Sequence, residues 1–372
     1  MDYEEARKYL ESLYKFGSVL GLNRMKVLME ALGDPQDDLK YIHLAGTNGK
    51  GSTAAACARV LEEAGLSVGL YISPYLEQFE ERISINGVPI DKSSVARLME
   101  RIRGAVEIAC RTCGESPTEF EVVTALGFTY FAEKRVDVVC LEVGLGGRFD
   151  ATNVIKKPEV ATITPIGFDH MDRLGRTLDK IAFEKAGIIK EGVTVVSAPQ
   201  KSEASRVIEE VCDRNGSHLY LGNRDFSWQE ISSGLDGQRF DFRGPFGDIS
   251  DLYFPLLGRH QQENAATAVM TVQAFAAAAA DRPDGRVHLS PDTIRRGLAK
   301  VVWPGRLEVV RESPTVLLDV AHNEDGAKVL SRAIRDLFGG RRIHLVIGLL
   351  KDKDVRGFLA NLLPLASSVV AS

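Results

Sequence analysis

The stretch from Tyr41 to Gly65 constrains this chain most, because it joins a short apolar run, a glycine-rich loop and a helical pattern. The apolar run 41–45 predicts a buried strand, the loop covers 46–51, and 52–64 predicts a helix that begins with small residues. Glycines have no Cβ, so backbone N–H groups of such a loop can approach phosphate oxygens, and the helix N-terminus adds partial positive charge. The stretch therefore predicts a phosphate-binding loop at the start of an α/β domain.

The loop departs from the strict pattern G-x-x-x-x-G-K-[ST], because Leu44 stands where the first glycine is expected and Gly51 precedes Ser52. Lys50 is expected on a solvated loop, from which it would reach the terminal phosphates, and Ser52 is expected to offer a hydroxyl to magnesium. An ordinary strand-to-helix turn is the alternative, but the density of glycine, lysine and hydroxyl residues favours a nucleotide site. The candidate nucleotide-binding residues of the loop are Gly46, Thr47, Asn48, Gly49, Lys50, Gly51 and Ser52.

The size and charge of the chain limit the classes of protein to consider. Its 372 residues exceed one ordinary domain and predict two. Charged residues make up 26% and hydrophobic residues 44%, as in a soluble globular protein, and the net charge of −5 argues against a nucleic-acid partner. Residues 1–13 are charged throughout, unlike a signal sequence, and the weakly polar run 268–280 is too short to span a bilayer. We therefore expect no membrane partner.

The five cysteines point to a reducing compartment. An odd number of cysteines in a long chain predicts free thiols and a cytoplasmic location. Cys110 and Cys113 form a lone C-x-x-C, and two cysteines that share a helix are a simpler interpretation than a zinc or redox site.

Two further strands end in residues that suit a metal site. The nearly continuous β-branched run 136–143 predicts a strand covered on both faces, with Glu142 near its carboxyl end, where ligands of open α/β sheets gather. A carboxylate at that place suits magnesium. Strand 160–164 is followed by Asp169 and His170, but spacing alone would not select His170, because magnesium prefers oxygen ligands.

The remaining pattern predicts alternating helices and strands. Helices are expected at 3–16, 93–113, 119–134, 201–215 and 291–300, together with a long alanine-rich helix after Gly258. The Asn86-Gly87 pair predicts a hairpin, and residues 219–256 predict a small antiparallel insertion without chemistry of its own. The segment "VVWPGRLEVV" is the best boundary, giving domains 1–302 and 303–372. Val369 and Val370 read as the opening of a strand, so the second domain is expected to be incomplete.

Several of these stretches, in the same order, resemble the folylpolyglutamate synthase/dihydrofolate synthase family of the Mur ligase superfamily. They are "GTNGKGS", "GLGGRFDATN", "EVATITPIGFDH", "PGR" and "TVLLDVAHNEDG". The resemblance extends from Gly17 to Asp354. It implies an α/β fold with a P-loop Mur-ligase-type central domain and a smaller Rossmann-like C-terminal domain, with ATP bound between them.

The resemblance also implies a reaction and a set of site residues. The reaction is the ATP-dependent ligation of L-glutamate to dihydropteroate or to folate polyglutamates through an acyl phosphate, with two Mg²⁺ ions. The implied metal ligands are Ser73, Glu142 and His170. The implied ATP contacts outside the loop are Asn264, Arg306 and Asp319. The implied substrate contacts are Gly17, Ser18, Val19, Thr118, Phe149, Asp150, Ala151 and His322. Lys50, His170 and Lys185 would be catalytic, with Lys185 carried as a carbamate (N6-carboxylysine).

Plainer interpretations of some of these residues stay open from the sequence. Thr118 could cap a helix, Asn264 could satisfy backbone groups at a helix start, and Lys185 could be a surface lysine beside Glu184. Thr118 and Glu121 look more like the branch that uses both acceptors than the folate-only branch. The protein is expected to act as a monomer on small molecules.

Two other functions compete with folate ligation. Another Mur-type ligase would add an amino acid to a nucleotide-sugar peptide, but "GLGGRFDATN" favours the folate branch. A P-loop switch that binds guanine nucleotides would need an N-K-x-D motif, and no Asn in this sequence precedes Lys.

Overall fold

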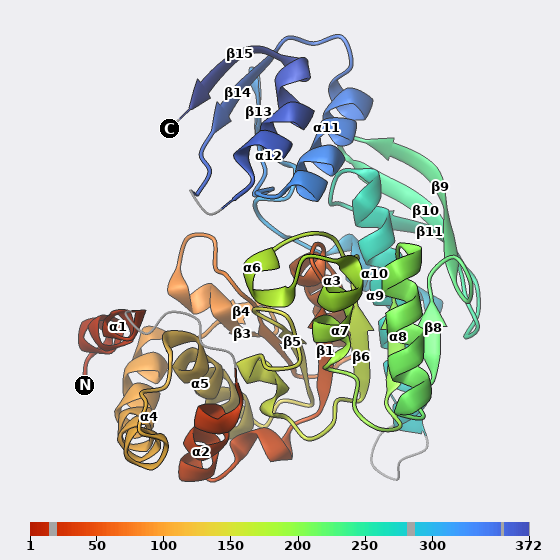
Figure 1. Cartoon of the computed structure of the whole chain (residues 1–372). Helices are drawn as coiled ribbons and strands as arrows, with labels where there is room; N and C mark the ends of the chain where they lie inside the picture. The colour runs from red at the N-terminus through yellow and green to blue at the C-terminus, as the bar shows by residue number, and fades with distance from the viewer. Residues whose placement is uncertain (15–20, 281–286, 351–352, 372) are drawn as a thin grey trace.

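An eight-stranded sheet forms the centre of the larger part of the molecule, in the order β4-β3-β2-β5-β1-β6-β7-β8 (Figure 1). The computed structural model describes residues 1–14, 21–280, 287–350 and 353–371. The predicted substrate residues Gly17, Ser18 and Val19 lie outside the described residues.

The strands of this sheet are short and mostly buried. They are β1 (Tyr41–Ala45), β2 (Val68–Tyr71), β3 (Ile83–Ile85), β4 (Val88–Pro89), β5 (Val138–Glu142), β6 (Val160–Ile163), β7 (Thr194–Ser197) and β8 (Leu219–Leu221). All pair in parallel except β3 and β4, which form the predicted hairpin at one edge. Because β5 and β6 flank β1 in parallel, the carboxyl ends of these three strands meet at one edge of the sheet.

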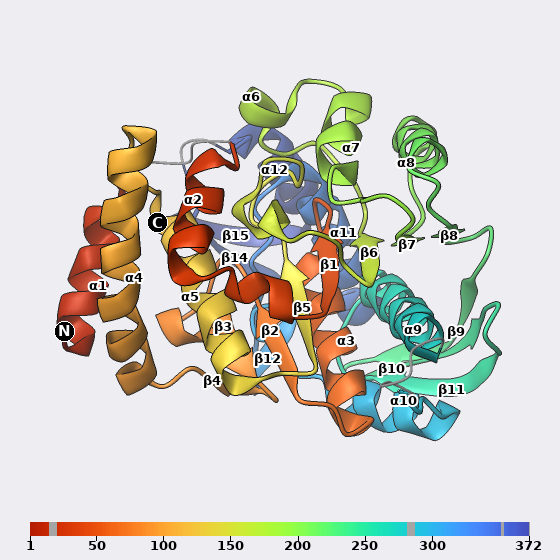
Figure 2. The same cartoon turned by 90° about the horizontal axis from the view of Figure 1, so that it is seen from below.

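Helices cover both faces of the sheet because alternate residues of each strand are apolar on both sides. Ile42 and Leu44 of β1 face a core that contains α3 (Lys50–Glu63), α9 (Arg259–Ala280) and α10 (Pro291–Ala299). Tyr41 and Ala45 face the other way. The helices on that side are α1 (Tyr3–Ser12), α2 (Asn23–Leu32), α4 (Lys92–Cys113), α5 (Glu119–Lys134), α7 (Leu178–Ala186) and α8 (Ser202–Arg214). Figure 2 shows the strands between α7 and α8 on one side and α9 and α10 on the other.

The predicted antiparallel insertion exists, but it is smaller than expected. Three strands form an antiparallel sheet against α9: β9 (Ser227–Gly234), β10 (Gly237–Arg243) and β11 (Ile249–Phe254). The expectation was wrong for β8, which pairs in parallel with β7 and extends the central sheet. A three-residue strand carries too little pattern to reveal its partner.

The C-terminal part is smaller and lies beyond the carboxyl edge of the central sheet (top, blue, in Figure 1). It contains an antiparallel pair, β12 (Glu308–Glu312) and β13 (Thr315–Leu318), and a parallel pair, β14 (Ile343–Ile347) and β15 (Ala366–Ala371). The helices α11 (Glu324–Phe338) and α12 (Val355–Leu362) pack on β14 through a small apolar core. The α/β class is confirmed, and β15 contains the strand predicted at Val369 and Val370.

Local signals set several helix ends correctly. Helix α5 covers the predicted residues, and α10 begins after Ser290, which accepts a hydrogen bond from the Thr293 N–H. Helix α3 begins at Lys50 rather than at the predicted Ser52, because Gly49, at φ 84°, forms its N-cap. Cys110 and Cys113 both lie in the last turn of α4, so the prediction that they share a helix is confirmed.

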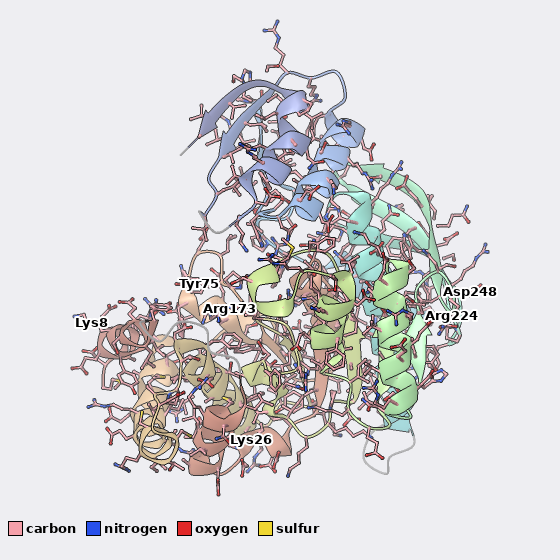
Figure 3. The ribbon with its side chains drawn as sticks, in the orientation of Figure 1. Lys8, Lys26, Tyr75, Arg173, Arg224 and Asp248 are labelled. Carbon is pink, nitrogen blue, oxygen red and sulfur yellow. The ribbon has the colours of Figure 1, made fainter. Side chains whose placement is uncertain are left out.

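The surface carries charges of both signs. Lys8 and Lys26 on the N-terminal helices, and Arg224 and Asp248 on the other side of the molecule, are among the exposed charged residues labelled in Figure 3. Among the described residues, no helix combines the length and apolar character needed to cross a bilayer.

Candidate active site

The phosphate loop is held in a conformation that only glycine permits at two positions. Gly46 has a φ of 152°, and a Cβ there would lie 1.8 Å from Thr164 Oγ1. Gly49 has a φ of 84°, and its Cβ would lie 2.3 Å from Asn264 Oδ1. Larger residues would strain the backbone and strike their neighbours. The loop is therefore wedged between the end of β6 and the start of α9.

The N–H groups available to a phosphate are those of the first turn of α3. The N–H groups of Thr47 and Asn48 already donate to Pro165 O, at 3.0 and 3.3 Å. The first-turn N–H groups of a helix have no intrahelical acceptor, and the N-cap Gly49 has no side chain to satisfy them. An anion placed at this helix N-terminus would accept hydrogen bonds and meet the positive end of the helix dipole.

Lys50 lies against the loop rather than in solvent, which corrects the expectation of a solvated lysine. Its Nζ donates to Gly46 O and Thr47 O, at 3.3 Å each, and is 4.0 Å from Glu142 Oε1. The side chain is only 16% exposed, because Lys50 belongs to the first turn of α3 and folds back over the loop. A cation is thus held beside the phosphate loop and the Glu142 carboxylate.

The oxygen donors near Lys50 fit a hard cation. The hydroxyl oxygens of Ser52 and Ser73 are buried without a hydrogen-bond partner among the described residues. The Glu142 carboxylate accepts from the Ser73 N–H at 3.2 Å. Burial raises the pKa of Glu142, whereas the charges of Lys50 and Arg306 lower it. Orphaned hydroxyls beside a carboxylate are a donor set that Mg²⁺ accepts.

Acidic, cysteine and histidine side chains alone do not make a metal cage. In the described part of the chain, no group of three or more such residues is arranged so that it could hold a metal ion. The donor set therefore suits an ion that takes most of its ligands from substrate phosphates and water, as Mg²⁺ commonly does.

Lys185 is a buried amine at the phosphate loop, so the surface-lysine interpretation is wrong. The residue is 5% exposed, and its Nζ donates to Gly46 O at 2.6 Å. Burial lowers the pKa of Lys185 from 10.5 to about 7, and the charge of Lys50 acts in the same direction. Asp169 and Asp150 act against this shift. Near pH 7, the Lys185 amine is therefore neutral in a large fraction of the molecules.

His170 is the N-cap residue of the short helix α6 (Met171–Leu174). Its backbone is left-handed, at φ 48°, and its side chain is 42% exposed. Burial lowers the pKa of His170, the charge of Asp169 raises it, and those of Lys353, Lys185 and Lys50 lower it further. The imidazole of His170 therefore lies close enough to Lys50 and Lys185 for their charges to act on it.

Two predicted ATP contacts come from the C-terminal part. Arg306 is partly buried, and burial lowers its pKa while the charges of Asp319 and Glu142 raise it. Asp319 directly follows β13 and accepts from the N–H groups of Leu307 and Ala321, at 3.0 and 2.8 Å. Trp303 packs on the loop, since a Cβ on Gly51 would lie 2.7 Å from its ring. The charge of Arg306, from the C-terminal part, thus acts on the carboxylate of Glu142 at the end of β5.

The carboxylate of Asp169 gathers side chains from the C-terminal part. It lies 3.6 Å from His322 Nε2 and accepts hydrogen bonds from Asn323 and Lys353, at 3.2 Å each. Burial acts to raise the pKa of Asp169, but His322, His170 and Lys353 together hold it well below its usual range.

Asn323 and Lys353 were missed in the sequence. Asn323 precedes a helical pattern and could have been recognised as an N-cap. Lys353 carries no local signal, because its partner Asp169 is 184 residues away.

The predicted substrate residues fall into two groups. Thr118 caps α5 and forms a capping box with Glu121, so its helix-capping role is confirmed. Asp150 is buried and accepts from Leu145 N–H and from both the N–H and hydroxyl of Thr152, so its carboxylate organises the turn. Their contact with a substrate stays a prediction.

The other candidates differ in exposure. Ala151 is buried, whereas the Phe149 ring is 38% exposed beneath the Arg148 guanidinium at 4.7 Å. Asn264 is buried at the start of α9, where its Nδ2 donates to Gln261 Oε1 at 2.9 Å.

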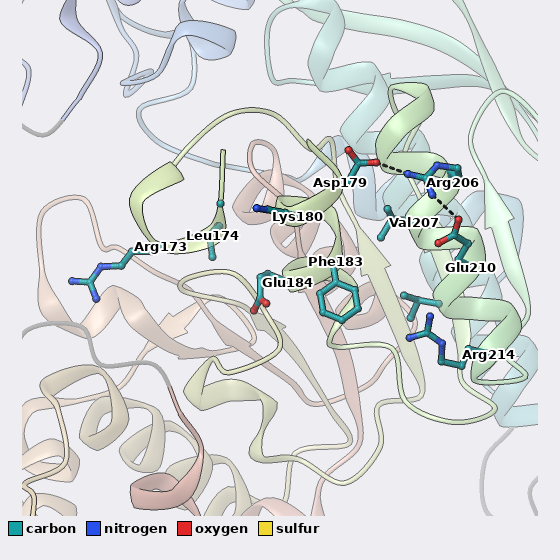
Figure 4. A pocket seen from close by; sticks show the side chains of 12 residues that line it. Arg173, Leu174, Asp179, Lys180, Phe183, Glu184, Arg206, Val207, Glu210 and Arg214 are labelled. Carbon is teal, nitrogen blue, oxygen red and sulfur yellow. Dashed lines mark hydrogen bonds and ion pairs between the residues drawn. The ribbon is translucent and has the colours of Figure 1, made fainter. Parts of the chain in front are cut away.

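A surface pocket of about 500 Å³ lies between α6, α7 and α8, away from the phosphate loop (Figure 4). It is lined by Arg173, Leu174, Gly175, Asp179, Lys180, Phe183, Glu184, Arg206, Val207, Glu210, Val211 and Arg214. Arg206 spans its rim through ion pairs to Asp179 and Glu210. None of the predicted site residues lines this pocket.

Comparison with known proteins agrees with this geometry. Residues 44–272 match the Mur ligase middle domain, and residues 305–372 match the Mur ligase glutamate ligase domain. The chain is 41% identical to dihydrofolate synthase/folylpolyglutamate synthase of Bacillus subtilis over 371 residues, which are 99% of this chain and 84% of that protein. It is also 41% identical to folylpolyglutamate synthase of Lacticaseibacillus casei over 95% of this chain and 81% of that protein.

Solved structures superpose on the whole chain. A structure described as an FPGS complex with AMPPCP and folate superposes with a TM-score of 0.91 at 39% identity, and the match covers all of this chain and 89% of that chain. Mycobacterium tuberculosis folylpolyglutamate synthase, solved with ADP and AMPPCP, gives a TM-score of 0.89 at 36% identity and is covered to 82%. The chain therefore belongs to the folylpolyglutamate synthase/dihydrofolate synthase family of the Mur ligase superfamily.

Proposed function

We propose that this protein uses ATP to join L-glutamate to dihydropteroate, to folate polyglutamates, or to both, through an acyl-phosphate intermediate. As a family member it is a folate ligase, and the acceptor and the roles of individual residues are the new part of the proposal. The observation that supports it most is that Lys50 of the phosphate loop and Arg306 of the C-terminal part both act on the carboxylate of Glu142.

The chemistry explains why phosphate contacts dominate the site. A carboxylate resists attack by an amine, because its leaving group would be oxide. Transfer of the γ-phosphoryl group to the acceptor carboxylate creates a good leaving group, and the amine of glutamate then displaces phosphate. Lys50 and the first turn of α3 would hold the transferred group, and Arg306 would contact it from the other side.

The residues that would hold two Mg²⁺ ions are Ser73, Glu142 and His170, with Ser52 close to the phosphates. When bound, the ions supply positive charge that offsets the charge of the phosphoryl group in the transition state. Asn264 and Asp319 would contact the nucleoside, and Thr118, Phe149, Asp150, Ala151 and His322 would contact the other substrates.

Lys185 would carry a carbamate. Its amine is buried and partly neutral near pH 7, which is what reaction with carbon dioxide requires. The amine nitrogen attacks the carbon of carbon dioxide, an N–C bond forms while one C=O π bond breaks, and one proton passes from the nitrogen to water, so that an anionic carbamate remains. This anion would face the cations of the site instead of adding a further positive charge beside Lys50.

We propose further that residues 1–302 and 303–372 form two domains that meet at the phosphate loop, and that the protein acts as a monomer in the cytoplasm. The five free cysteines agree with a reducing compartment.

Product analysis tests the proposed function. The purified protein is incubated with ATP, Mg²⁺ and L-glutamate and with either dihydropteroate or tetrahydrofolate, and the products are identified by mass spectrometry. We expect ATP-dependent glutamylation of at least one acceptor. Absence of a glutamylated product with both acceptors, in protein that binds ATP, would contradict the proposal.

A further inference from the structure

Asp169 joins the two parts of the molecule through its side chain. Its Oδ2 accepts from Asn323 at 3.2 Å, and its Oδ1 accepts from Lys353 at 3.2 Å. The side chains of Asp169 and Lys353 are only 13% and 12% exposed. One carboxylate thus binds two groups that lie 154 and 184 residues along the chain.

Asn323 extends this contact to the phosphate loop. Its Nδ2 also donates to Asn48 Oδ1 at 3.2 Å, and its Oδ1 caps α11 by accepting from the Gly326 N–H at 2.8 Å. Asp325, two residues after Asn323, packs closely against Gly167, since a Cβ on Gly167 would lie 2.2 Å from the Asp325 carboxylate. The loops after β1 and β6 therefore contact the start of α11 along one continuous polar surface.

Apart from the exposed ion pair of Arg259 with Asp336, at 3.7 Å, a further contact between the two parts is apolar. Leu257, which precedes α9, packs with Leu307 and Ala333 in a small buried cluster. Apolar packing of this kind is non-directional and tolerates small rotations. A hydrogen-bonded ion pair is directional, and a partner left behind in a buried place is strongly unfavourable. The polar contact, rather than the apolar one, thus defines the relative orientation.

We propose that Asp169 is a positioning residue for ligation: it latches the C-terminal part onto the phosphate loop through Lys353 and Asn323. The latch holds Arg306 and His322 over the loop in the arrangement that glutamate addition needs. The activity readout of this inference rests on the proposed function, whereas the latch itself can be measured without catalysis.

Asp169 also accepts a hydrogen bond from the His170 N–H, at 2.9 Å, so it could act through His170 alone. Substitution of Lys353 separates the two possibilities, because Lys353 lies on the C-terminal part. The test compares Asp169→Asn, Lys353→Gln and the double variant. Arg335→Gln is the control, since Arg335 is exposed in the last turn of α11, at the opposite end of that helix from Asn323.

Each single variant is expected to lower kcat/KM for glutamate by at least about tenfold at saturating ATP and folate, because misplacement of reacting groups is costly. Each should also raise amide hydrogen exchange in both facing segments, 164–170 and 319–326, at an unchanged melting temperature. The double variant should fall within about threefold of the weaker single variant, because both changes break one contact. The control should match the wild type in both readouts.

The inference is overturned if Lys353→Gln leaves hydrogen exchange at 164–170 and kcat/KM for glutamate as in the wild type. It is also overturned if the two losses multiply, because Asp169 would then act independently of Lys353. If Asp169→Asn does not fold, the exchange result for Lys353→Gln decides alone. A wild type that shows the latch in hydrogen exchange but ligates no acceptor contradicts the proposed function and leaves the latch supported.

Discussion

The two sides of the candidate site are built on very different supports. The phosphate loop follows β1, whose five residues are all buried, and its neighbours β5 and β6 are buried throughout. In the C-terminal part, β12 and β14 are half-buried or exposed at every position, and the apolar core is small. The loop side is therefore fixed by packing, whereas the C-terminal side depends on a few polar contacts. A site made this way can bind phosphate rigidly on one side and adjust on the other.

The largest expected effect comes from the rigid side. Lys50→Ala should lower kcat by at least roughly 150-fold, or about 3 kcal/mol, because one preorganised donor to the transferred phosphoryl group is lost. The melting temperature should change little, since the contacts of Lys50 are long: 3.3 Å to each of two loop carbonyls and 4.0 Å to Glu142. Steady-state ligation assays and thermal melts measure both.

Lys300→Ala is the matched control for Lys50→Ala. Lys300 also contacts α3, through an ion pair with Glu63 at 2.6 Å, but its side chain is 58% exposed and distant from the loop. The Lys300→Ala variant should catalyse ligation at the wild-type rate. Wild-type rates in folded Lys50→Ala protein would contradict the phosphate-loop assignment.

A loss on the order of 100-fold is expected for Lys185→Ala, because the carbamate anion disappears from the centre of the site. Short-chain carboxylic acids should restore part of the rate by filling the vacated anion position, and removal of carbon dioxide should slow the wild type. Lys180→Ala, on the exposed side of the same helix, is the control. Normal ligation by Lys185→Ala would show that the carbamate has no role.

The buried amine also predicts a pH dependence of stability. Because the folded-state pKa of Lys185 is lowered to about 7, the unfolded chain binds the extra proton more tightly between pH 7 and 10.5. Lys185 therefore destabilises the fold fully below pH 7, by a few kcal/mol at most, and the cost fades as the pH rises towards 10.5. The Lys185→Met variant should therefore have a higher melting temperature than the wild type at pH 7 in carbon-dioxide-free buffer.

The difference between the two melting temperatures should shrink by pH 10. A constant difference from pH 7 to pH 10 would mean that Lys185 has an ordinary pKa in the folded protein. Differential scanning calorimetry under both conditions gives the answer.

The smallest effect concerns the adjustable side. Amides of β14 and β15 should exchange hydrogen faster than those of β1 and β5, and AMPPCP should slow exchange mainly in the C-terminal part. Hydrogen-exchange mass spectrometry resolves the two regions. Uniform protection of both regions without nucleotide would remove the proposed contrast.

The same contrast explains what could be predicted from the sequence. The strand at 41–45 and the helix at 119–134 follow from local apolar patterns and caps, and both are confirmed. The start of α3 was placed too late, because the left-handed backbone of Gly49 is not encoded in helix propensity. The burial of Lys185 and the pairing of Asp169 with Lys353 depend on chain segments more than 100 residues apart, and no local pattern reports them.

The most direct test of the central claim is a crystal structure of this protein with AMPPCP and Mg²⁺. The account predicts that the phosphates lie at the first turn of α3 within hydrogen-bond distance of Lys50, and that Arg306 contacts the same nucleotide. A nucleotide bound elsewhere, such as between α6, α7 and α8, or bound at the loop without any contact from the C-terminal part, would contradict it.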